Sequence, residues 1–362
     1  MKKEHPKKVC FIGRGLTGGG MERALTSLAN YFAEHHYDVI ILNLFDTEVF
    51  YELHREIQLI WPGINRKKLH RFVYATALLP YIRKEIKKTR PDVILSFGEW
   101  FNAYVILATR FLGVRLFITN RMGPMLKLGF PLDNANRILY KYANGVIAQT
   151  QTAKEIIYKK TNNKNIKVIP NAVSPINVSS VSGKKQIVTV GRLSREKGHI
   201  LLLKAFATLK HPDWTLHIVG DGPEREKLEQ KTESLGLNNR VSFYGHKKEF
   251  SHILAASDIF VLPSYYEGFP NALIEAMSVP LACISSDCVA GPADIIQDGI
   301  NGLLVEPGNV GTLASALNHL IENPELRKRL ALAAYKVREQ YNFYRIAKEY
   351  LGFLFSDYKN PK

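Results

Sequence analysis

The segment QIVTVGRLSREKGHILLLKAFATL, residues 186–209, has the pattern of one strand–loop–helix unit. An apolar run comes first, a charged loop follows, and the last part carries apolar residues at helical spacing. The same order begins near the N-terminus, in KVCFIGRGLTGGGMERALTSLANYFAEH, residues 8–35. Further apolar strands alternate with helical stretches in both halves, which indicates parallel sheets covered on both faces. We predict an α/β protein of two Rossmann-like, doubly wound domains that face each other across a cleft.

A segment rich in Ser, Pro and Asn, residues 170–185, separates the two patterns and is read as the linker. The chain has 362 residues, more than one core normally serves, which also favours two domains. We place the domains at residues 1–172 and 173–340. The basic and aromatic tail, residues 341–362, is expected to be helical and to pack back toward the N-terminal domain.

The cysteines and the apolar runs indicate where the protein resides. Cys10, Cys283 and Cys288 show no metal-ligand spacing, so we interpret them as buried thiols in a reducing compartment. The apolar run after the N-terminus is too short for a signal peptide, and no stretch reaches the length needed to span a bilayer. We therefore expect a cytoplasmic location.

The formal net charge of +16 is distributed unevenly. Residues 1–170 contain 27 Lys/Arg and 13 Asp/Glu (27 − 13 = +14), whereas residues 171–362 contain 22 and 20 (22 − 20 = +2). Such asymmetry predicts that the N-terminal half faces an anionic partner. Residues 66–90 place nine Lys/Arg around an aromatic and aliphatic centre, with Glu85 as the single acid. This segment can lie on an anionic bilayer, or it can be an ordinary helix with a solvated basic face.

The segment PSYYEGFPNALIEAM, residues 263–277, carries the strongest chemical pattern. A strand ends before it, and a helix is expected from about Pro270, which suits a first helical turn. The free N–H groups of such a helix attract phosphate. Glu267 and Glu275 can together accept hydrogen bonds from vicinal hydroxyls. They can equally be a capping glutamate and an ordinary helix glutamate.

Cations and glycines mark two further loops. Arg192 and Lys197, in VGRLSREKGH (residues 190–199), follow a strand and could neutralise a departing diphosphate, although either could be a solvated surface cation. Gly19 and Gly20 precede the first helix and would let the backbone approach a ligand closely, which alone is a weak signal. The turn VGDGPE, residues 219–224, is interpreted as mainly structural. Because no Asp-x-Asp pair or metal-binding histidine motif occurs, we expect neither a metal nor another cofactor.

These motifs resemble those of the retaining glycosyltransferases of family 4, which have the GT-B fold. EGFPNALIEAM is similar to the family's Glu-x7-Glu signature. GGGMERA, VGRLSREKG, IVGDGPE, VSFYGH and GPADIIQDGINGLLVEPGN follow in the family's order. The resemblance implies that the N-terminal domain binds the acceptor and that the C-terminal domain binds a nucleotide diphosphate sugar.

The resemblance also implies residue roles. Glu267 would contact the donor sugar, Glu275 the ribose hydroxyls, and Arg192 and Lys197 the diphosphate. The backbone around Gly268, Phe269, Pro270, Asn271 and Ala272 would face sugar and phosphate, Gly19 and Gly20 would approach the phosphates, and His246 would lie near the base. Arg121 stands where many relatives carry a histidine, and an arginine there can orient sugar or phosphate but cannot act as a base.

The prediction from sequence is therefore a retaining, metal-independent transferase. It would move a hexose or N-acetylhexosamine, from UDP in the first instance, to a saccharide, with a polyprenyl-diphosphate-linked glycan of surface polysaccharide or glycoprotein assembly as the favoured acceptor. Peripheral contact with the cytoplasmic face of the plasma membrane is expected, and nucleic acid is not. The alternatives are a nucleotide-sugar epimerase or phosphorylase on the same architecture, or a noncatalytic basic partner or nucleic-acid-binding protein.

Overall fold

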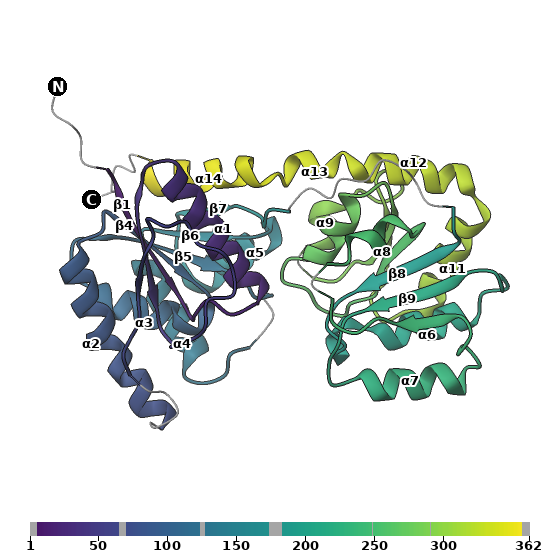
Figure 1. Cartoon of the computed structure of the whole chain (residues 1–362), viewed down its shortest axis with the longest axis horizontal. Helices are drawn as coiled ribbons and strands as arrows, with labels where there is room; N and C mark the ends of the chain where they lie inside the picture. Colours follow the sequence, from purple (N-terminus) through teal and green to yellow (C-terminus); the bar gives the residue numbers. More distant parts are fainter. Residues whose placement is uncertain are drawn as a thin grey trace. The chain divides into compact units, whose positions relative to one another are not determined.

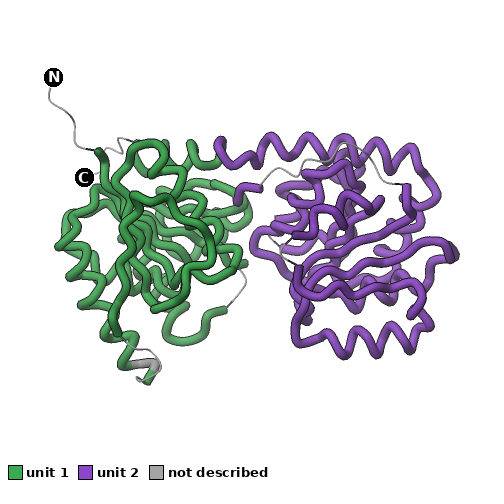
Figure 2. The backbone as a smooth tube through the Cα atoms, in the orientation of Figure 1, with its two compact units in different colours: residues 1–170, 346–362 green, residues 171–345 purple. Residues whose placement is uncertain are grey.

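The structure, a computed structural model, describes residues 6–64, 70–123, 127–173, 183–247, 249–289 and 291–356. The chain forms two compact units (Figure 2). Unit 1 comprises Met1–Pro170 with Ile346–Lys362, and unit 2 comprises Asn171–Arg345. These divisions fall a few residues from the boundaries predicted from sequence. Residues 174–182 of the predicted linker and 357–362 of the predicted tail lie outside the described residues.

The described part of unit 1 holds a seven-stranded parallel sheet in the order β3-β2-β1-β4-β5-β6-β7 (Figure 1). Its strands are β1 (Lys8–Gly13), β2 (Asp38–Asn43), β3 (Gln58–Ile60), β4 (Val93–Phe97), β5 (Arg115–Asn120), β6 (Gly145–Ala148) and β7 (Ile166–Val168). The connecting helices are α1 (Gly20–Glu34), α2 (Arg71–Thr89), α3 (Glu99–Thr109), α4 (Leu132–Leu139), η2 (Tyr140–Tyr142) and α5 (Gln151–Thr161).

The described part of unit 2 repeats this architecture with six parallel strands in the order β10-β9-β8-β11-β12-β13. Its strands are β8 (Gln186–Val190), β9 (Thr215–Val219), β10 (Val241–Phe243), β11 (Ile259–Leu262), β12 (Ala282–Ser286) and β13 (Leu303–Val305). The helices are η3 (Arg195–Lys197), α6 (His199–Ala207), α7 (Arg225–Ser234), α8 (Ser251–Ala255), α9 (Asn271–Met277), α10 (Pro292–Ile295), α11 (Val310–Glu322), α12 (Pro324–Tyr335), α13 (Val337–Gln340) and α14 (Phe343–Phe355), the last of which continues into unit 1.

Each sheet changes its winding direction beside its first strand. In unit 1 the chain moves from β1 outward to β3 and then returns to β4 on the other side of β1. In unit 2 the equivalent neighbours are β8 and β11. At such a switch point the loops that follow the two strands diverge and leave space for a ligand. The doubly wound prediction is therefore confirmed for each unit, and in unit 2 the loops after β8 and β11 lie at the switch point.

The C-terminal helix α14 completes the core of unit 1. The ring of Phe353 lies 5.1 Å from that of Phe117 on β5, edge to face. Gly145, at the start of β6, makes room for both rings, because a Cβ there would lie 2.7 Å from Phe353 and 2.8 Å from Phe117. Helix α14 thus packs against the sheet of unit 1 although it follows unit 2 in sequence.

The cysteines have the environment expected from the sequence. Cys10, Cys283 and Cys288 are buried and unpaired. Burial raises the pKa of the Cys10 thiol to about 12, and burial together with the nearby Glu267 carboxylate raises the pKa of Cys288 to about 12. The interpretation as buried thiols is confirmed. Within the described residues, no helix is long and apolar enough to cross a membrane.

Candidate active site

Two loops of unit 2 are held together at the carboxyl ends of β8 and β11. The backbone N–H of Tyr265, after β11, donates to the carbonyl of Glu196, after β8, at 2.8 Å. Gly198 has φ +67° and packs directly on the carbonyl of Pro263, where a Cβ would be far inside contact distance. Glycine therefore serves two needs at this position: a left-handed backbone and a close approach between the loops.

The two loops bring Lys197 and Glu267 together. The Lys197 ammonium donates to Oε1 of Glu267 at 2.7 Å and to Oε2 at 2.9 Å, and the Ser264 hydroxyl donates to Oε1 at 2.7 Å. The Glu267 side chain is 4% exposed and that of Lys197 is 27% exposed. The Ser264 hydroxyl and the Lys197 ammonium thus hold the buried carboxylate in place. The ammonium itself is partly exposed, and its third N–H can donate to another acceptor. Sequence reasoning selected both residues but did not predict this ion pair.

Arg192 lies on the same loop as Lys197 and is exposed. Burial alone would raise the pKa of Glu196, but a hydrogen bond from Ser194 and the charges of Lys197 and Arg192 lower it overall. Both cations thus lie within electrostatic reach of one carboxylate in this loop. The sequence prediction that Arg192 and Lys197 share one loop at a strand end holds, and their role toward a diphosphate remains a prediction.

Helix α9 begins one residue later than the sequence suggests. Pro270 is its N-cap, with φ −80° and ψ 74°, rather than a residue of its first turn. Asn271 accepts a hydrogen bond at Oδ1 from Asn171 Nδ2 at 2.8 Å. Phe269 is buried, with its ring 5.9 Å from that of Tyr341. The predicted contacts of this segment with sugar and phosphate stay predictions, including those of the half-buried Gly268, Ala272 and Glu275.

The loops after β9 and β10 support the loop after β8. Gly220 donates its N–H to the carbonyl of Gly245 at 2.9 Å, and Glu224 donates to that of Leu193 at 2.9 Å. A Cβ on Gly222 would lie 2.5 Å from the Leu193 carbonyl oxygen. The structural interpretation of the 219–224 turn is therefore confirmed. His246 is exposed just beyond β10, and its proposed place near a base is not tested by these contacts.

Sequence reasoning missed His199, the first residue of α6. Its side chain is buried beside the Gly191 backbone and Lys197, and Nδ1 has no hydrogen-bond partner among the described residues. Burial, with the charge of Lys197, lowers the pKa of His199 to about 4. A neutral imidazole is thus packed under the cationic loop at neutral pH. A single histidine after a glycine carries no sequence signal for this position.

Replacing His199 with phenylalanine is expected to reduce the loss of stability in acid. In the unfolded chain, His199 binds a proton below its usual pKa near 6.5, whereas in the folded protein its pKa is about 4. Between these two values the unfolded state binds more protons than the folded state. The free energy of unfolding therefore falls as the pH decreases from 6.5 to 4. The full effect is on the order of 3 kcal/mol. Urea denaturation of both proteins across this range measures it. Parallel stability curves for the two proteins would contradict the assignment.

Three predicted site residues lie in unit 1. Gly19 is the N-cap of α1 and accepts a hydrogen bond from the Tyr51 hydroxyl at 3.2 Å. The position of a Cβ on Gly19 is occupied by the Glu22 carboxylate, whereas Gly20 has no atom within 4 Å. Gly20 is thus the more open of the two glycines. The Arg121 guanidinium stacks over the Phe97 ring at 5.0 Å, so this side chain packs within unit 1.

Two doubly wound sheets, with cations and a fixed carboxylate at the switch point of the second, are typical of α/β proteins that bind a ligand at the carboxyl ends of their strands. Comparison with known proteins identifies the family. Residues 18–175 match the model described as Glycosyltransferase Family 4, and residues 175–337 match the one described as Glycosyl transferases group 1. The chain belongs to these family 4-type glycosyltransferases and has the GT-B fold.

Similar proteins act in bacterial glycan assembly. The amylovoran biosynthesis glycosyltransferase AmsD of Erwinia amylovora is 28% identical, over 89% of this chain and 92% of its own. The GalNAc-α-(1→4)-GalNAc-α-(1→3)-diNAcBac-PP-undecaprenol α-1,4-N-acetyl-D-galactosaminyltransferase of Campylobacter jejuni is 29% identical, over 98% of this chain and 99% of its own. The solved structure of the apo lipopolysaccharide outer core galactosyltransferase WaaB is 26% identical, with a TM-score of 0.81 over 96% of this chain and 99% of that one.

Proposed function

We propose that this glycosyltransferase moves a hexose or N-acetylhexosamine from a nucleoside diphosphate, UDP in the first instance, to a lipid-linked saccharide of surface-glycan assembly. The observation that carries the proposal is the Lys197–Glu267 pair at the switch point of unit 2. This pair places a cation, which can bind the diphosphate, beside a carboxylate, which can accept hydrogen bonds from sugar hydroxyls. The acceptor is suggested by the Campylobacter relative, whose name describes transfer to an undecaprenol-diphosphate-linked glycan.

In this proposal, Lys197 and Arg192 stabilise the negative charge that develops on the diphosphate as the bond from the anomeric carbon to its oxygen breaks. Glu267 accepts hydrogen bonds from donor-sugar hydroxyls, and Glu275 from the ribose. The acceptor hydroxyl forms the new bond to the anomeric carbon, and its proton passes to the departing diphosphate. Retention of configuration follows from the resemblance to family 4 and is part of the proposal.

The function is tested by a thermal-shift screen of nucleoside diphosphates in the presence of EDTA, followed by turnover of the sugar donors that share the best base. We expect one diphosphate to stabilise the protein by several degrees with EDTA present, because ligand at ~100 times its Kd adds about 2.7 kcal/mol. Stabilisation that requires a divalent cation would contradict the metal-independent route. Product anomers, read by NMR, report retention or inversion.

The same assay separates the alternatives. An epimerase would convert the donor without any acceptor, and a phosphorylase would require inorganic phosphate. A transferase releases nucleoside diphosphate at a rate that rises with the saccharide acceptor. A rate that is independent of every saccharide tested, with an isomerised donor as product, would favour the epimerase.

The proposal includes peripheral contact with an anionic membrane, but at a surface other than the one the sequence suggests. Residues 66–69 lie outside the described residues, and one side of the helix formed by the rest of the 66–90 segment is buried. Every fourth residue of α2 faces the core of unit 1, namely Tyr74, Leu78, Ile82 and Ile86. These four side chains are not available to lipid while unit 1 is folded, which favours the alternative of an ordinary helix with a solvated basic face. That the 66–90 segment lies on an anionic bilayer stays a prediction.

A better candidate lies where α3 ends, beside α2 (Figure 1). Phe111 is 89% exposed, and Arg110 lies over its ring at 5.0 Å and over the Tyr142 ring at 4.0 Å. Lys141 lies 5.1 Å from the Tyr142 ring. Exposed aromatics interleaved with cations suit the interface of an anionic bilayer.

Replacing Phe111 with serine should lower the fraction of protein that floats with phosphatidylglycerol-containing liposomes at low salt about 10-fold or more, because a buried aromatic side chain contributes ~2 kcal/mol. Phe130 is equally exposed, at 89%, and Phe130→Ser is the matched control. Flotation that is equal in both variants, or absent in the wild type, would contradict this membrane surface.

A further inference from the structure

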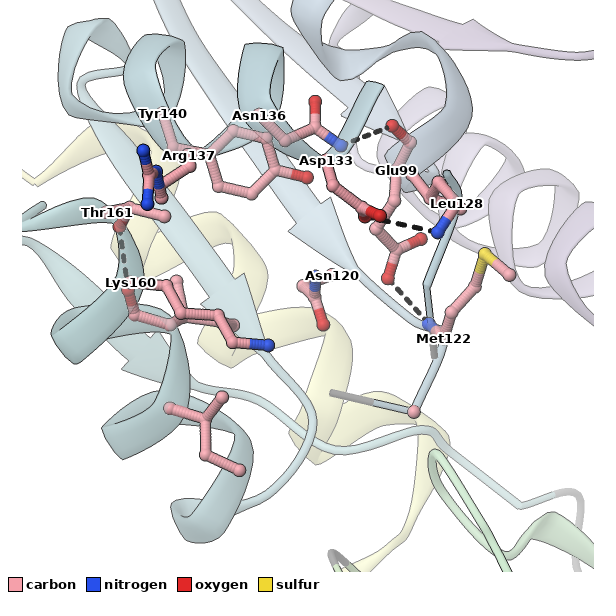
Figure 3. Close-up of a pocket in the computed structure, with 13 residues that line it drawn as sticks. Glu99, Asn120, Met122, Leu128, Asp133, Asn136, Arg137, Tyr140, Lys160 and Thr161 are labelled. Atoms are coloured by element: carbon pink, nitrogen blue, oxygen red, sulfur yellow. Dashed lines mark hydrogen bonds between the residues drawn. The ribbon is translucent and has the colours of Figure 1, made fainter. Parts of the chain in front are cut away.

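A pocket in unit 1, lined by apolar and polar side chains, lies beside the backbone of Arg121. It is a cavity of about 90 Å³, situated where β5 ends and between α4 and α5 (Figure 3). By comparison, one water needs about 10–15 Å³ of such space. Its walls combine apolar and polar side chains, which include Glu99, Asn120, Asn136, Tyr140, Ile156 and Lys160. Glu99 follows β4 and therefore stands at the switch point of this sheet.

Two buried side chains leave hydrogen-bonding atoms in this region without partners among the described residues. Glu99 is 5% exposed, and its Oε1 accepts the N–H groups of Arg121 at 2.5 Å and Met122 at 2.6 Å, whereas Oε2 has no partner. Asn136 is 8% exposed; its Nδ2 donates to the Glu99 carbonyl at 2.9 Å, whereas Oδ1 has no partner. A buried polar atom without a partner is costly, so a hydrogen bond from water or from a ligand to these atoms would stabilise the folded unit.

Asn120 adds a third oxygen. The Tyr140 hydroxyl accepts a hydrogen bond from Asn102 Nδ2 at 2.9 Å and is also hydrogen-bonded to the Asn120 side chain. Asn120 Oδ1 is buried and has no partner among the described residues. Three oxygens from three different elements thus require hydrogen-bond partners beside one pocket.

The chemistry of these atoms selects hydroxyl groups. Burial raises the pKa of Glu99, while the N–H groups of Met122 and Arg121 oppose the shift. If Glu99 is ionised its Oε2 accepts a hydrogen bond, and if it is protonated it donates one. A hydroxyl can meet either requirement and can also donate to the asparagine oxygens, whereas an ammonium can only donate.

Cations at the exposed side of the pocket favour a ligand that also carries a negative charge. Lys160 and Arg137 line the pocket and are exposed, and Figure 3 shows the Lys160 chain extending into it. A guest that suits both ends carries several hydroxyls at the buried end and a negative charge toward the solvent. A sugar joined to phosphate has this composition, and its phosphate would meet the cations.

We propose that the Glu99–Asn120–Asn136 pocket binds the sugar of a phosphate-linked saccharide through its hydroxyls, with the phosphate toward Lys160 and Arg137. This inference rests on the proposed function, since it assigns the pocket to the acceptor. Residues of α5 also line the pocket, and substituting them can block it without removing any of the hydrogen bonds described above.

The probe is N-acetylglucosamine 1-phosphate, with free N-acetylglucosamine and inorganic phosphate as separate arms. Binding is measured by saturation-transfer NMR with saturating UDP present. Ile156→Trp fills the pocket from a half-buried position, and Tyr158→Trp, exposed on the same helix, is its control. Lys160→Ala removes a lining cation, and the adjacent Lys159→Ala does not.

We expect the sugar phosphate to bind, and Ile156→Trp to weaken binding about 10-fold or more, as the loss of several hydrogen bonds implies. Lys160→Ala should weaken binding of the sugar phosphate and leave binding of free N-acetylglucosamine unchanged. Both control variants should bind the sugar phosphate as tightly as the wild type does. Equal binding in all variants, binding of inorganic phosphate alone, or no binding tighter than ~10 mM would overturn the proposal and leave ordered water as the guest.

Turnover separates a failure of this inference from a failure of the proposed function. Ile156→Trp should raise the KM for the saccharide acceptor and leave slow hydrolysis of the donor, without acceptor, unchanged. If Ile156→Trp transfers sugar at the normal rate, the assignment of this pocket to the acceptor is wrong, but the proposed transferase function is unaffected. If no preparation transfers sugar, the proposed function itself fails.

Discussion

Replacing Lys197 with alanine is expected to lower turnover at least ~100-fold, because in the proposed function this variant loses a main charge-stabilising contact to the departing diphosphate. Glu275→Ala should have an effect of the same size through the loss of its contact with the donor. Initial rates at saturating donor and acceptor measure both. Lys185→Ala is the matched control, because Lys185 also pairs with a carboxylate, that of Asp213, but precedes β8 at its other end.

The Lys197 variant also affects folding, and the two effects must be separated. Without the ammonium, the buried Glu267 carboxylate keeps the Ser264 hydroxyl but loses its counter-charge, which costs about 3–5 kcal/mol. The double variant Lys197→Met/Glu267→Gln removes both charges and should recover most of this stability. If it also recovers the rate, Lys197 is structural; we expect the rate to stay at least ~100-fold low.

Replacing Gly198 with alanine is expected to destabilise unit 2 by about 3 kcal/mol or more, since the methyl group collides with the Pro263 carbonyl and the residue has φ +67°. The collision would separate the loops that carry Lys197 and Glu267, so turnover should fall as well. Chemical denaturation and initial rates at 25 °C measure the two effects.

Gly236→Ala isolates the backbone part of this effect. Gly236 has φ +69°, almost the value at Gly198, but no atom lies within 4 Å of the position of its Cβ. Strain without collision should cost only about 1 kcal/mol and leave turnover unchanged. Equal losses in the two variants would show that the close approach to Pro263 contributes nothing.

The central part of each sheet could be predicted from the sequence. Strands such as β1, β4 and β11 are buried on both faces and are therefore continuous apolar runs. Strands β3, β7 and β13 are harder to predict, because each has only three residues and lies at the edge of a sheet. Short, partly exposed edge strands lack the apolar run that identifies a buried one.

The sequence predicts which loops form the candidate site, but it does not predict the side-chain contacts within it. Lys197 and Glu267 could be chosen because each follows a strand that parallel winding brings to one edge. Their direct ion pair could not, because it depends on how closely Gly198 lets the loops approach. Glu99 and His199 were missed because a single glutamate or histidine carries no spacing pattern. The 66–90 segment left two alternatives open for a related reason: the sequence shows its charges but not that Tyr74, Leu78 and Ile82 face the core of unit 1.

In the proposed function, the loop after β8 holds a nucleoside diphosphate. The most direct test is calorimetric titration of UDP, GDP and ADP into the full chain and into Arg192→Ala/Lys197→Ala, with Lys185→Ala alongside. Binding of one diphosphate to the wild type and to Lys185→Ala, weakened at least about 100-fold in the double variant, is the result predicted for two lost charge-assisted contacts. Equal affinity in all three proteins would contradict the claim.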